Sequence, residues 1–260
     1  MTLQLSLEAR NLRKRFGALL VSDDISFELA AGARHALIGP NGAGKTTLLG
    51  LLSGTLAADG GEVLLMGHDV TRKGPASRVK QGLVRTFQIS KLFSNLTVFE
   101  NLYLPCNEFA GTSASMFMPA RRNSAVIDRA DKLLTELGLS VVRDHLVSEI
   151  SYGQQRLVEL GIALSLEPKV LLLDEPAAGI PSGEIGIILS AIEQLPPEIA
   201  VLLIEHDMQI VRRFATKVTV LVSGAVLISA RPDEVMASEE VQRVYLGRSG
   251  HQRFTGAAHA

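Results

Sequence analysis

The stretch GPNGAGKT, Gly39 to Thr46, decides the fold. It fits the pattern G-x-x-x-x-G-K-[ST] without departure and lies between a short apolar run, RHALIG, and a helix-like run, KTTLLGLLSG. Glycines let such a loop curl so that its N–H groups, and the positive end of the following helix, face phosphate oxygens. Lys45 would neutralise the β- and γ-phosphates, and the Thr46 hydroxyl would ligate Mg²⁺. The alternative is a Gly-rich turn with an exposed lysine, but the strand-loop-helix setting favours a P-loop. The phosphate-binding residues expected here are Gly39, Pro40, Asn41, Gly42, Ala43, Gly44, Lys45, Thr46 and Thr47.

Two apolar runs end in acidic residues, as buried parallel strands do where α/β proteins place their chemistry. In LLLDEP, Asp174 is a candidate Mg²⁺ ligand and Glu175 a candidate to polarise the attacking water. Strands commonly end in acidic turns, so this run indicates a catalytic site only in combination with the P-loop. In LLIEHD, His206 holds the same position; a lone histidine is more often structural, but here it could reach the γ-phosphate or the water.

Two further features are ambiguous by themselves. In RTFQ, Gln88 stands where the sheet region gives way to a helical region, and its amide could reach Mg²⁺ or its water. In EISYGQQRLVEL, Ser151 and Gln154 fit a capping box, in which they satisfy N–H groups at the start of a helix. The same helix end could instead bind a phosphate.

The remaining patterns predict an α/β chain. Antiparallel strands are expected at LQLSLEA, ISFEL and EVLLMG, buried parallel strands at KVLLLDE and AVLLIEHD, and a hairpin at VTVLVSGAVLIS with its turn at Ser223-Gly224. One helix should end near Gly54 and a second by Pro168; a third is expected in VIDRADKLLTELGL, with its buried face at Ile127, Ala130, Leu133, Leu134 and Leu137. A further helix is expected around PDEVMA or SEEVQRVYL, and residues 106–123 read as a loop or marginal helix.

Composition sets limits on the class of protein. The chain has 260 residues, 47% of them apolar, and a formal charge of −1, which gives no general attraction to nucleic acid or anionic membranes. Cys106 is the single cysteine, so an internal disulfide cannot form and a reducing compartment is expected. The N-terminal residues do not read as a signal peptide, and no apolar run approaches the ~18 residues that span a bilayer, so any membrane role should come through partners.

The motifs together resemble the ATP-binding cassette (ABC) ATPases. GPNGAGKTT, Gln88, SYGQQ, LLLDE and IEHD occur in the order and approximate spacing of that family, from about Leu5 to Gly247. RTFQ, LTVFENL, SYGQQR, DEPAAG, EHDM and VYLG resemble more narrowly the ATP-binding subunits of branched-chain (hydrophobic) amino acid importers.

The resemblance implies a P-loop NTPase (RecA-like) core with an N-terminal antiparallel β patch and an inserted α-helical signature subdomain. It places the core in residues 1–88 and 165–250, the helical subdomain in 89–164, and a flexible tail in 251–260. It also implies that two subunits sandwich two ATP molecules head to tail. Phe16 would stack on adenine, with Phe where Tyr is usual, and Ser151, Gly153 and Gln154 would serve the ATP held by the opposing subunit.

Two departures from the family pattern stand out. The signature LSGGQ reads ISYGQ here, which keeps Ser151, Gly153 and Gln154. After Asp174 and Glu175, the loop has Pro181 where an Asp or Asn followed by Pro is common, which puts communication between the two ATP sites through this loop in question.

The expected function is therefore ATP hydrolysis that powers an importer from the cytoplasmic face of a bacterial inner membrane. The expected partners are membrane permeases, a second ATP-binding subunit, identical or related, and, indirectly, a solute-binding protein, with no nucleic acid. Branched-chain amino acids are the expected solute, with other amino acids, amides or urea as alternatives. A soluble ABC ATPase without a transport role is the other class considered, although such proteins typically carry a second cassette or a coiled-coil insertion.

Overall fold

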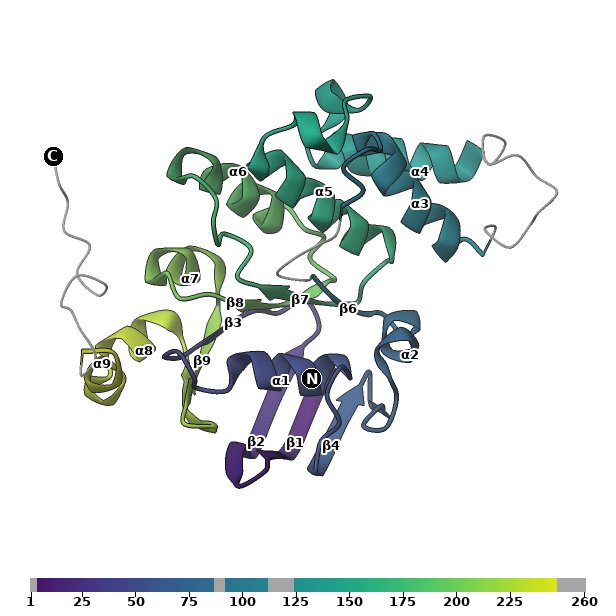
Figure 1. The fold of residues 1–260 in the computed structure, drawn as a ribbon. Coiled ribbons are helices and arrows are strands. Elements are labelled where there is room, and N and C mark those ends of the chain that lie inside the picture. Colours follow the sequence, from purple (N-terminus) through teal and green to yellow (C-terminus); the bar gives the residue numbers. More distant parts are fainter. Residues whose placement is uncertain (1–3, 87–91, 112–123, 247–260) are drawn as a thin grey trace, which may run out of the picture. The chain divides into compact units, whose positions relative to one another are not determined.

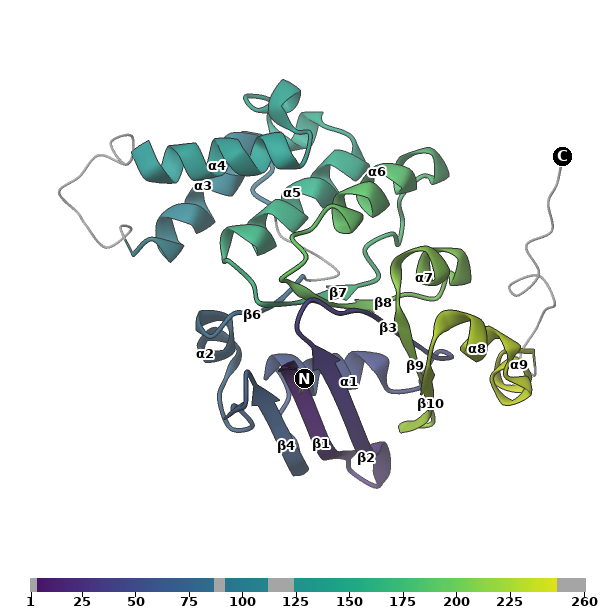
Figure 2. The same ribbon diagram turned by 180° about the vertical axis from the view of Figure 1, so that it is seen from behind.

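The computed structural model describes residues 4–86, 92–111 and 124–246. The chain divides into two compact units (Figures 1 and 2). The first unit comprises Met1–Arg85, Lys169–Glu175 and Pro196–Ala260, and the second comprises Thr86–Pro168 and Pro176–Leu195. In the described residues, no helix is both long and apolar enough to cross a bilayer.

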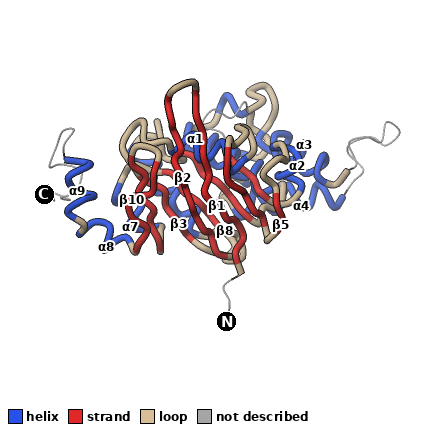
Figure 3. Tube along the Cα trace, turned by 90° about the horizontal axis from the view of Figure 1, so that it is seen from below, coloured by secondary structure: helices blue, strands red, loops and turns tan. Residues whose placement is uncertain are grey.

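An antiparallel sheet forms one layer of the first unit (Figure 3). Its strand order is β2-β1-β4-β5, with β1 at Leu5–Phe16, β2 at Leu19–Ala30, β4 at Gly60–Leu65 and β5 at His68–Asp69. The predicted antiparallel patch is thus confirmed, but β1 and β2 are longer than their alternating patterns suggested. The extension of β1 passes through Asn11, whose φ of 50° accompanies a shift in register between Ala9 and Leu12. This irregularity breaks the alternation on which the prediction relied.

The second sheet of this unit carries the strands that flank the P-loop. Its order is β10-β9-β3-β8-β7-β6, with β3 at Arg34–Ile38, β6 at Leu83–Arg85, β7 at Val170–Asp174, β8 at Ala200–Ile204, β9 at Lys217–Val222 and β10 at Ala225–Ala230. All pairs are parallel except β9 with β10, which form the predicted hairpin. Its turn residues have φ of 48° at Ser223 and 83° at Gly224, as a two-residue hairpin turn requires.

Helix α1 (Lys45–Ser53) follows the P-loop and supplies the centre of the core in this unit. Its leucines are buried in one apolar cluster with side chains from both sheets, such as Leu7, Ile25, Leu172 and Leu202. The helix ends at Gly54, as predicted, where φ is 79°. The remaining helices of the unit are α2 (Pro75–Lys80), α7 (Met208–Phe214), α8 (Pro232–Ala237) and α9 (Glu239–Leu246). Both sequence candidates for a late helix are therefore helical.

Arg78 in α2 fastens the end of α1. The side chain is 1% exposed. Its guanidinium donates hydrogen bonds to Leu51 O at 2.7 Å and Leu52 O at 2.6 Å, and also to the carbonyls of Thr71 and Lys73. The C-terminal carbonyls of a helix lack intrahelical donors, so a buried cation there stabilises the helix end. Arg78 thus anchors the helix whose first residue is Lys45.

The second unit is helical. Helices α3 (Val98–Phe109), α4 (Ser124–Glu136) and α5 (Tyr152–Ser165) pack on one another, and α6 (Ser182–Glu193) packs on α5. Short 3-10 turns lie at Ser140–Val142 and Val147–Glu149. The predicted face of α4 is buried at Ala130, Leu133 and Leu134, but Val126 is buried where Ile127 was expected, and Ile127 is half-buried. Residues 106–109 of the segment read as a loop or marginal helix form the last turn of α3, and 112–123 lie outside the described residues.

Candidate active site

The P-loop connects β3 to α1. Gly44 is the residue before the helix, with φ 100° and ψ 8°, and a Cβ at this position would lie 2.8 Å from Val21 O. Only glycine satisfies both the left-handed backbone and the close approach. No side chain of the described residues caps α1, so its first N–H groups are available to an external anion.

Lys45 folds back over its own loop. Its Nζ donates to Gly39 O at 2.7 Å and to Pro40 O at 3.1 Å. Burial lowers the pKa of this ammonium, while the nearby carboxylates of Glu175 and Asp174 oppose that shift. The side chains of Thr46 and Asn41 are exposed, Thr47 is half-buried, and Ala43 is buried. The loop therefore presents a cation, an exposed hydroxyl and helix N–H groups.

Asp174 ends β7 and is paired with an arginine. The Arg85 guanidinium donates from Nη2 to Asp174 Oδ2 at 2.7 Å, and both side chains are largely buried. A buried carboxylate without a cation would be costly, so this pair compensates the burial of Asp174 within the fold. The sequence motif RTFQ begins with Arg85, but only Gln88 in it drew a functional hypothesis. Arg85 reaches Asp174 because β6 lies beside β7 in parallel register, which the sequence did not reveal.

Glu175 adopts a rare backbone conformation. Its φ is 48°, in the left-handed region, and its N–H donates to Ile204 O at 3.0 Å. Residues with long side chains seldom take this conformation, and such outliers are enriched at functional sites, although Met66 and Glu167 of this chain share it. The outlier favours the functional interpretation of Glu175 over that of an ordinary acidic turn.

His206 lies just beyond the end of β8. Its side chain is 55% exposed, whereas the preceding Glu205 is 1% exposed. Glu205 Oε2 accepts the His206 N–H at 3.2 Å and lies 3.8 Å from His206 Nδ1. Register pairs Asp174 with Ile204 on neighbouring parallel strands, so Glu175 and His206 leave the sheet at one edge. The P-loop leaves β3, the next strand along, at that same edge.

Two other candidates are Phe16 and Gln88. Phe16, at the end of β1, is 47% exposed, and Lys14 Nζ is 5.6 Å from the centre of its ring. An exposed aromatic face of this kind can stack on a base. Gln88 lies outside the described residues.

The signature segment belongs to the second unit and contains the predicted capping box. Ser151 Oγ accepts the Gln154 N–H at 3.3 Å, and Gln154 Oε1 accepts the Ser151 N–H at 3.0 Å. Sequence reasoning missed one residue here. Glu184 lies in the first turn of α6. Its Oε2 accepts hydrogen bonds from Ser151 Oγ at 3.1 Å and from the Gly153 N–H at 2.6 Å. No sequence spacing links Glu184 to the signature segment, so only the packing of α6 on α5 reveals it.

The oxygen atoms near the P-loop suit a hard cation whose remaining ligands come from a bound phosphate. Among the described residues, no cluster of three or more His, Cys, Asp or Glu could hold a metal by itself. Mg²⁺ commonly takes one or two protein oxygens together with phosphate oxygens. The exposed Thr46 hydroxyl and the Asp174 carboxylate supply oxygen atoms of that kind.

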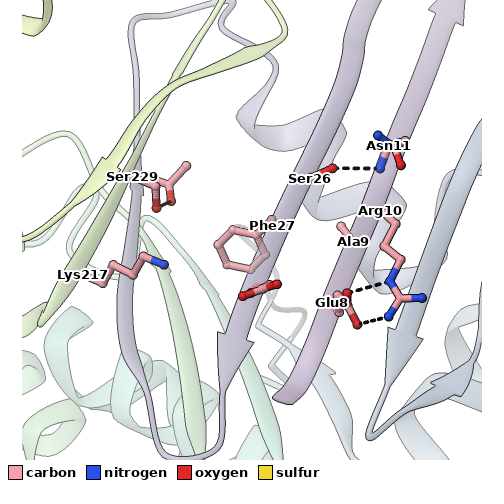
Figure 4. Close-up of a pocket in the computed structure, with 10 residues that line it drawn as sticks. Glu8, Ala9, Arg10, Asn11, Ser26, Phe27, Lys217 and Ser229 are labelled. Atoms are coloured by element: carbon pink, nitrogen blue, oxygen red, sulfur yellow. Dashed lines mark hydrogen bonds and ion pairs between the residues drawn. The ribbon is translucent and has the colours of Figure 1, made fainter. Parts of the chain in front are cut away.

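A separate groove of about 400 Å³ lies between β1 and β2 on one side and β9 and β10 on the other (Figure 4). Phe27 and Lys217 face it, and Arg10 pairs with Glu8 at its rim. Thr219 lines the groove and bonds through Oγ1 to Nε2 of buried His35 at 2.8 Å, and burial lowers the pKa of His35 to about 3. None of the sequence-predicted site residues lines this groove.

Comparisons with known proteins agree with this geometry. The family model "ABC transporter" matches residues 22–178. The chain is 34% identical to the probable branched-chain amino acid transport ATP-binding protein LivG of Methanocaldococcus jannaschii, covering 93% of this chain and 97% of that protein. It is 35% identical to the high-affinity branched-chain amino acid transport ATP-binding protein LivG of Salmonella typhimurium, covering 94% and 98%.

Solved structures agree as well. An ATP-binding cassette of an ABC transporter in its ADP conformation matches with a TM-score of 0.83 and 32% identity, covering 94% of this chain and 99% of that one. A nucleotide-free ATP-binding cassette matches with a TM-score of 0.81 and 31% identity, covering 93% and 98%.

Proposed function

Because this chain belongs to the ATP-binding proteins of the ABC transporter family, we propose that it powers the import of branched-chain amino acids. The family assignment makes it an ATPase that works with membrane permease components. The solute is supported by one observation: two relatives described as branched-chain amino acid transport proteins match over nearly their full length, at 34% and 35% identity. We place the subunit at the cytoplasmic face of the membrane, held there by its permeases.

The residues at the sheet edge where the P-loop lies would each bind a different part of ATP and its Mg²⁺. Lys45 would exchange the carbonyls of Gly39 and Pro40 for the β- and γ-phosphates, and the first N–H groups of α1 would bind the remaining oxygens. Phe16 would stack on the adenine. Thr46 and Asp174 would hold Mg²⁺, with the Gln88 amide reaching it or its water. When bound, Mg²⁺ supplies positive charge against the phosphate oxygens.

Hydrolysis would proceed by in-line attack of water on the γ-phosphorus. Glu175 accepts a hydrogen bond from the water and takes its proton as the new P–O bond forms, while the bond to the β-phosphate oxygen breaks and ADP leaves. His206, exposed at the same edge, donates to a γ-phosphate oxygen or orients the water. Lys45 neutralises the charge that develops on the leaving phosphate.

We further propose that the ATPase works as a pair, with an identical or related subunit. Lys45 and the P-loop bind one ATP, and Ser151 and Gly153 then serve the ATP held by the opposing subunit. The capping box supports this role, because it fixes Ser151 at the N-terminus of a helix of 14 residues.

Reconstitution tests the solute assignment. The chain would be assembled in liposomes with its permeases and solute-binding protein, and ATP hydrolysis would be measured with leucine, isoleucine, valine, other amino acids, amides and urea. Stimulation by branched-chain amino acids is the expected result. Stimulation only by amides or urea would replace the solute, and hydrolysis indifferent to every solute and to the permeases would favour a non-transport ATPase.

A further inference from the structure

The N-terminus of α5 already carries an anion, and that anion is a side chain of the same molecule. Glu184 Oε2 accepts hydrogen bonds from Ser151 Oγ and from the Gly153 N–H. The hydroxyl and the amide each have one hydrogen to donate. A single carboxylate oxygen therefore occupies both of the donors that we assign to the γ-phosphate of the opposing subunit's ATP.

This contact depends on a close approach between two helices. Helices α5 and α6 lie side by side within the helical unit (Figures 1 and 2). A Cβ at Gly153 would collide with the Glu184 carboxylate and lie 3.1 Å from Glu184 Cβ. Gly153 has no positive φ, so backbone conformation does not require glycine here. A larger residue here would instead have to displace the Glu184 carboxylate.

The position of Glu184 is fixed by the start of its own helix. Its N–H donates to Pro181 O at 2.8 Å, which closes the first turn of α6. Pro181 is the residue at which the loop after Asp174 and Glu175 departs from the family pattern. The residue that carries this carboxylate is therefore hydrogen-bonded to the loop that follows Asp174 and Glu175.

A phosphate oxygen and the Glu184 carboxylate oxygen are both anionic acceptors, and they require the same two hydrogens. They cannot bind together, and their charges repel at short range. We propose that Glu184 is a tethered competitor, which occupies the Ser151–Gly153 site in the ATP-free chain and must leave before the opposing subunit's γ-phosphate can bind. This inference rests on the pairing proposed above and adds to it a barrier that the chain itself supplies.

The test compares Glu184→Gln and Glu184→Ala with wild type, and with Glu193→Gln at the other end of α6 as a matched control. Two quantities are measured for each, with the chain alone and mixed with the second ATP-binding subunit of its transporter. The first is the affinity of the unpaired chain for a fluorescent ATP analogue. The second is the dissociation constant of the ATP-bound pair, from light scattering or sedimentation.

If Glu184 competes, Glu184→Ala tightens the ATP-bound pair by about tenfold, because a charge-assisted contact no longer has to break. Glu184→Gln removes the charge but keeps an oxygen that can accept both hydrogens, so it should tighten the pair by a smaller factor. Nucleotide affinity of the unpaired chain and the behaviour of Glu193→Gln should match wild type. Hydrogen exchange at the Gly153 amide should be faster in the ATP-free Glu184→Ala chain.

Pairing of equal or lower strength in both Glu184 variants would overturn the competition and make Glu184 a structural brace, while leaving the proposed pairing intact. A wild-type chain that does not pair in ATP, with or without the second subunit, would instead contradict the pairing, and the competition would fall with it. The two outcomes can be told apart, because the wild-type chain pairs measurably in ATP in the first and does not pair in the second.

Discussion

Arg85 and Asp174 form a buried ion pair at the edge of the sheet where the P-loop lies, with 2.7 Å between Nη2 and Oδ2. The guanidinium takes one carboxylate oxygen of the proposed Mg²⁺ ligand. Arg85 is also the last residue of β6, three positions before Gln88. The pair therefore connects the proposed metal ligand to the strand that leads into the Gln88 segment.

Replacing Arg85 should destabilise the fold. Arg85→Met leaves the Asp174 carboxylate buried without its cation, which costs on the order of 3–5 kcal/mol of unfolding free energy. Urea unfolding would measure the loss. The double variant Arg85→Met/Asp174→Asn removes the charge as well and should recover most of it. A single variant as stable as wild type would show that the pair does not hold Asp174.

Removing the Glu175 carboxylate should separate binding from turnover. Glu175→Gln keeps the size and hydrogen-bonding capacity of the side chain but cannot take a proton from water. We expect ATP binding to match wild type, hydrolysis to fall by roughly 10²-fold or more, and an ATP-bound pair to accumulate on gel filtration. Glu205, the first residue after the neighbouring strand β8, is buried and therefore poorly placed to replace Glu175. Wild-type hydrolysis by this variant would remove Glu175 from its role.

Arg78 should be irreplaceable by lysine. A guanidinium reaches four carbonyls in different directions, whereas an ammonium has three hydrogens on a single atom. Arg78→Lys should lower the unfolding free energy by about 2 kcal/mol, because buried carbonyls at the end of α1 lose their donors. Lys80→Arg, in the same helix, serves as the control, and unfolding in urea gives both values. Equal stability of Arg78→Lys and wild type would contradict the anchoring role.

The buried His35 should make stability depend on pH. Its pKa falls from 6.5 to about 3 in the folded chain because burial and the nearby Lys217 disfavour the imidazolium. As the pH falls from 6.5 towards 3, the unfolded chain binds a proton here and the folded chain does not. The unfolding free energy should therefore fall with pH in this window, by about 1.4 kcal/mol per unit at most.

Unfolding in urea between pH 7 and pH 5 would measure this dependence. His35→Gln, which can still bond to Thr219, should have a shallower slope than wild type. A slope that is the same in His35→Gln and wild type would assign the pH dependence to other groups.

The elements that the sequence predicted best are those in which local pattern and long-range packing agree. The apolar runs before Asp174 and before Glu205 form buried parallel strands, and the hairpin at Ser223-Gly224 has the backbone that its residues favour. The face of α4 was placed nearly correctly, because a 3.6-residue period leaves Val126 and Ile127 about equally close to its edge.

Contacts between elements distant in the sequence could not be predicted. Arg85 touches Asp174 and Glu184 touches Ser151 because of strand order and helix packing, and neither pair has a characteristic spacing. The left-handed conformation of Glu175 was also missed, because propensity assigns such φ values to Gly and Asn, not to Glu. In each case the tertiary fold imposed an arrangement that the local sequence does not indicate.

The strand order also constrains how this protein is synthesised. Strand β3, which delivers the P-loop, has β8 and β9 as its parallel neighbours, and both are encoded more than 150 residues later. A ribosome that has released only the first half of the chain has therefore exposed β3 without either neighbour. Such non-local pairing slows folding and leaves apolar strands open to aggregation. The P-loop is among the first parts to be translated, but the strand before it can pair with its neighbours only near the end of synthesis.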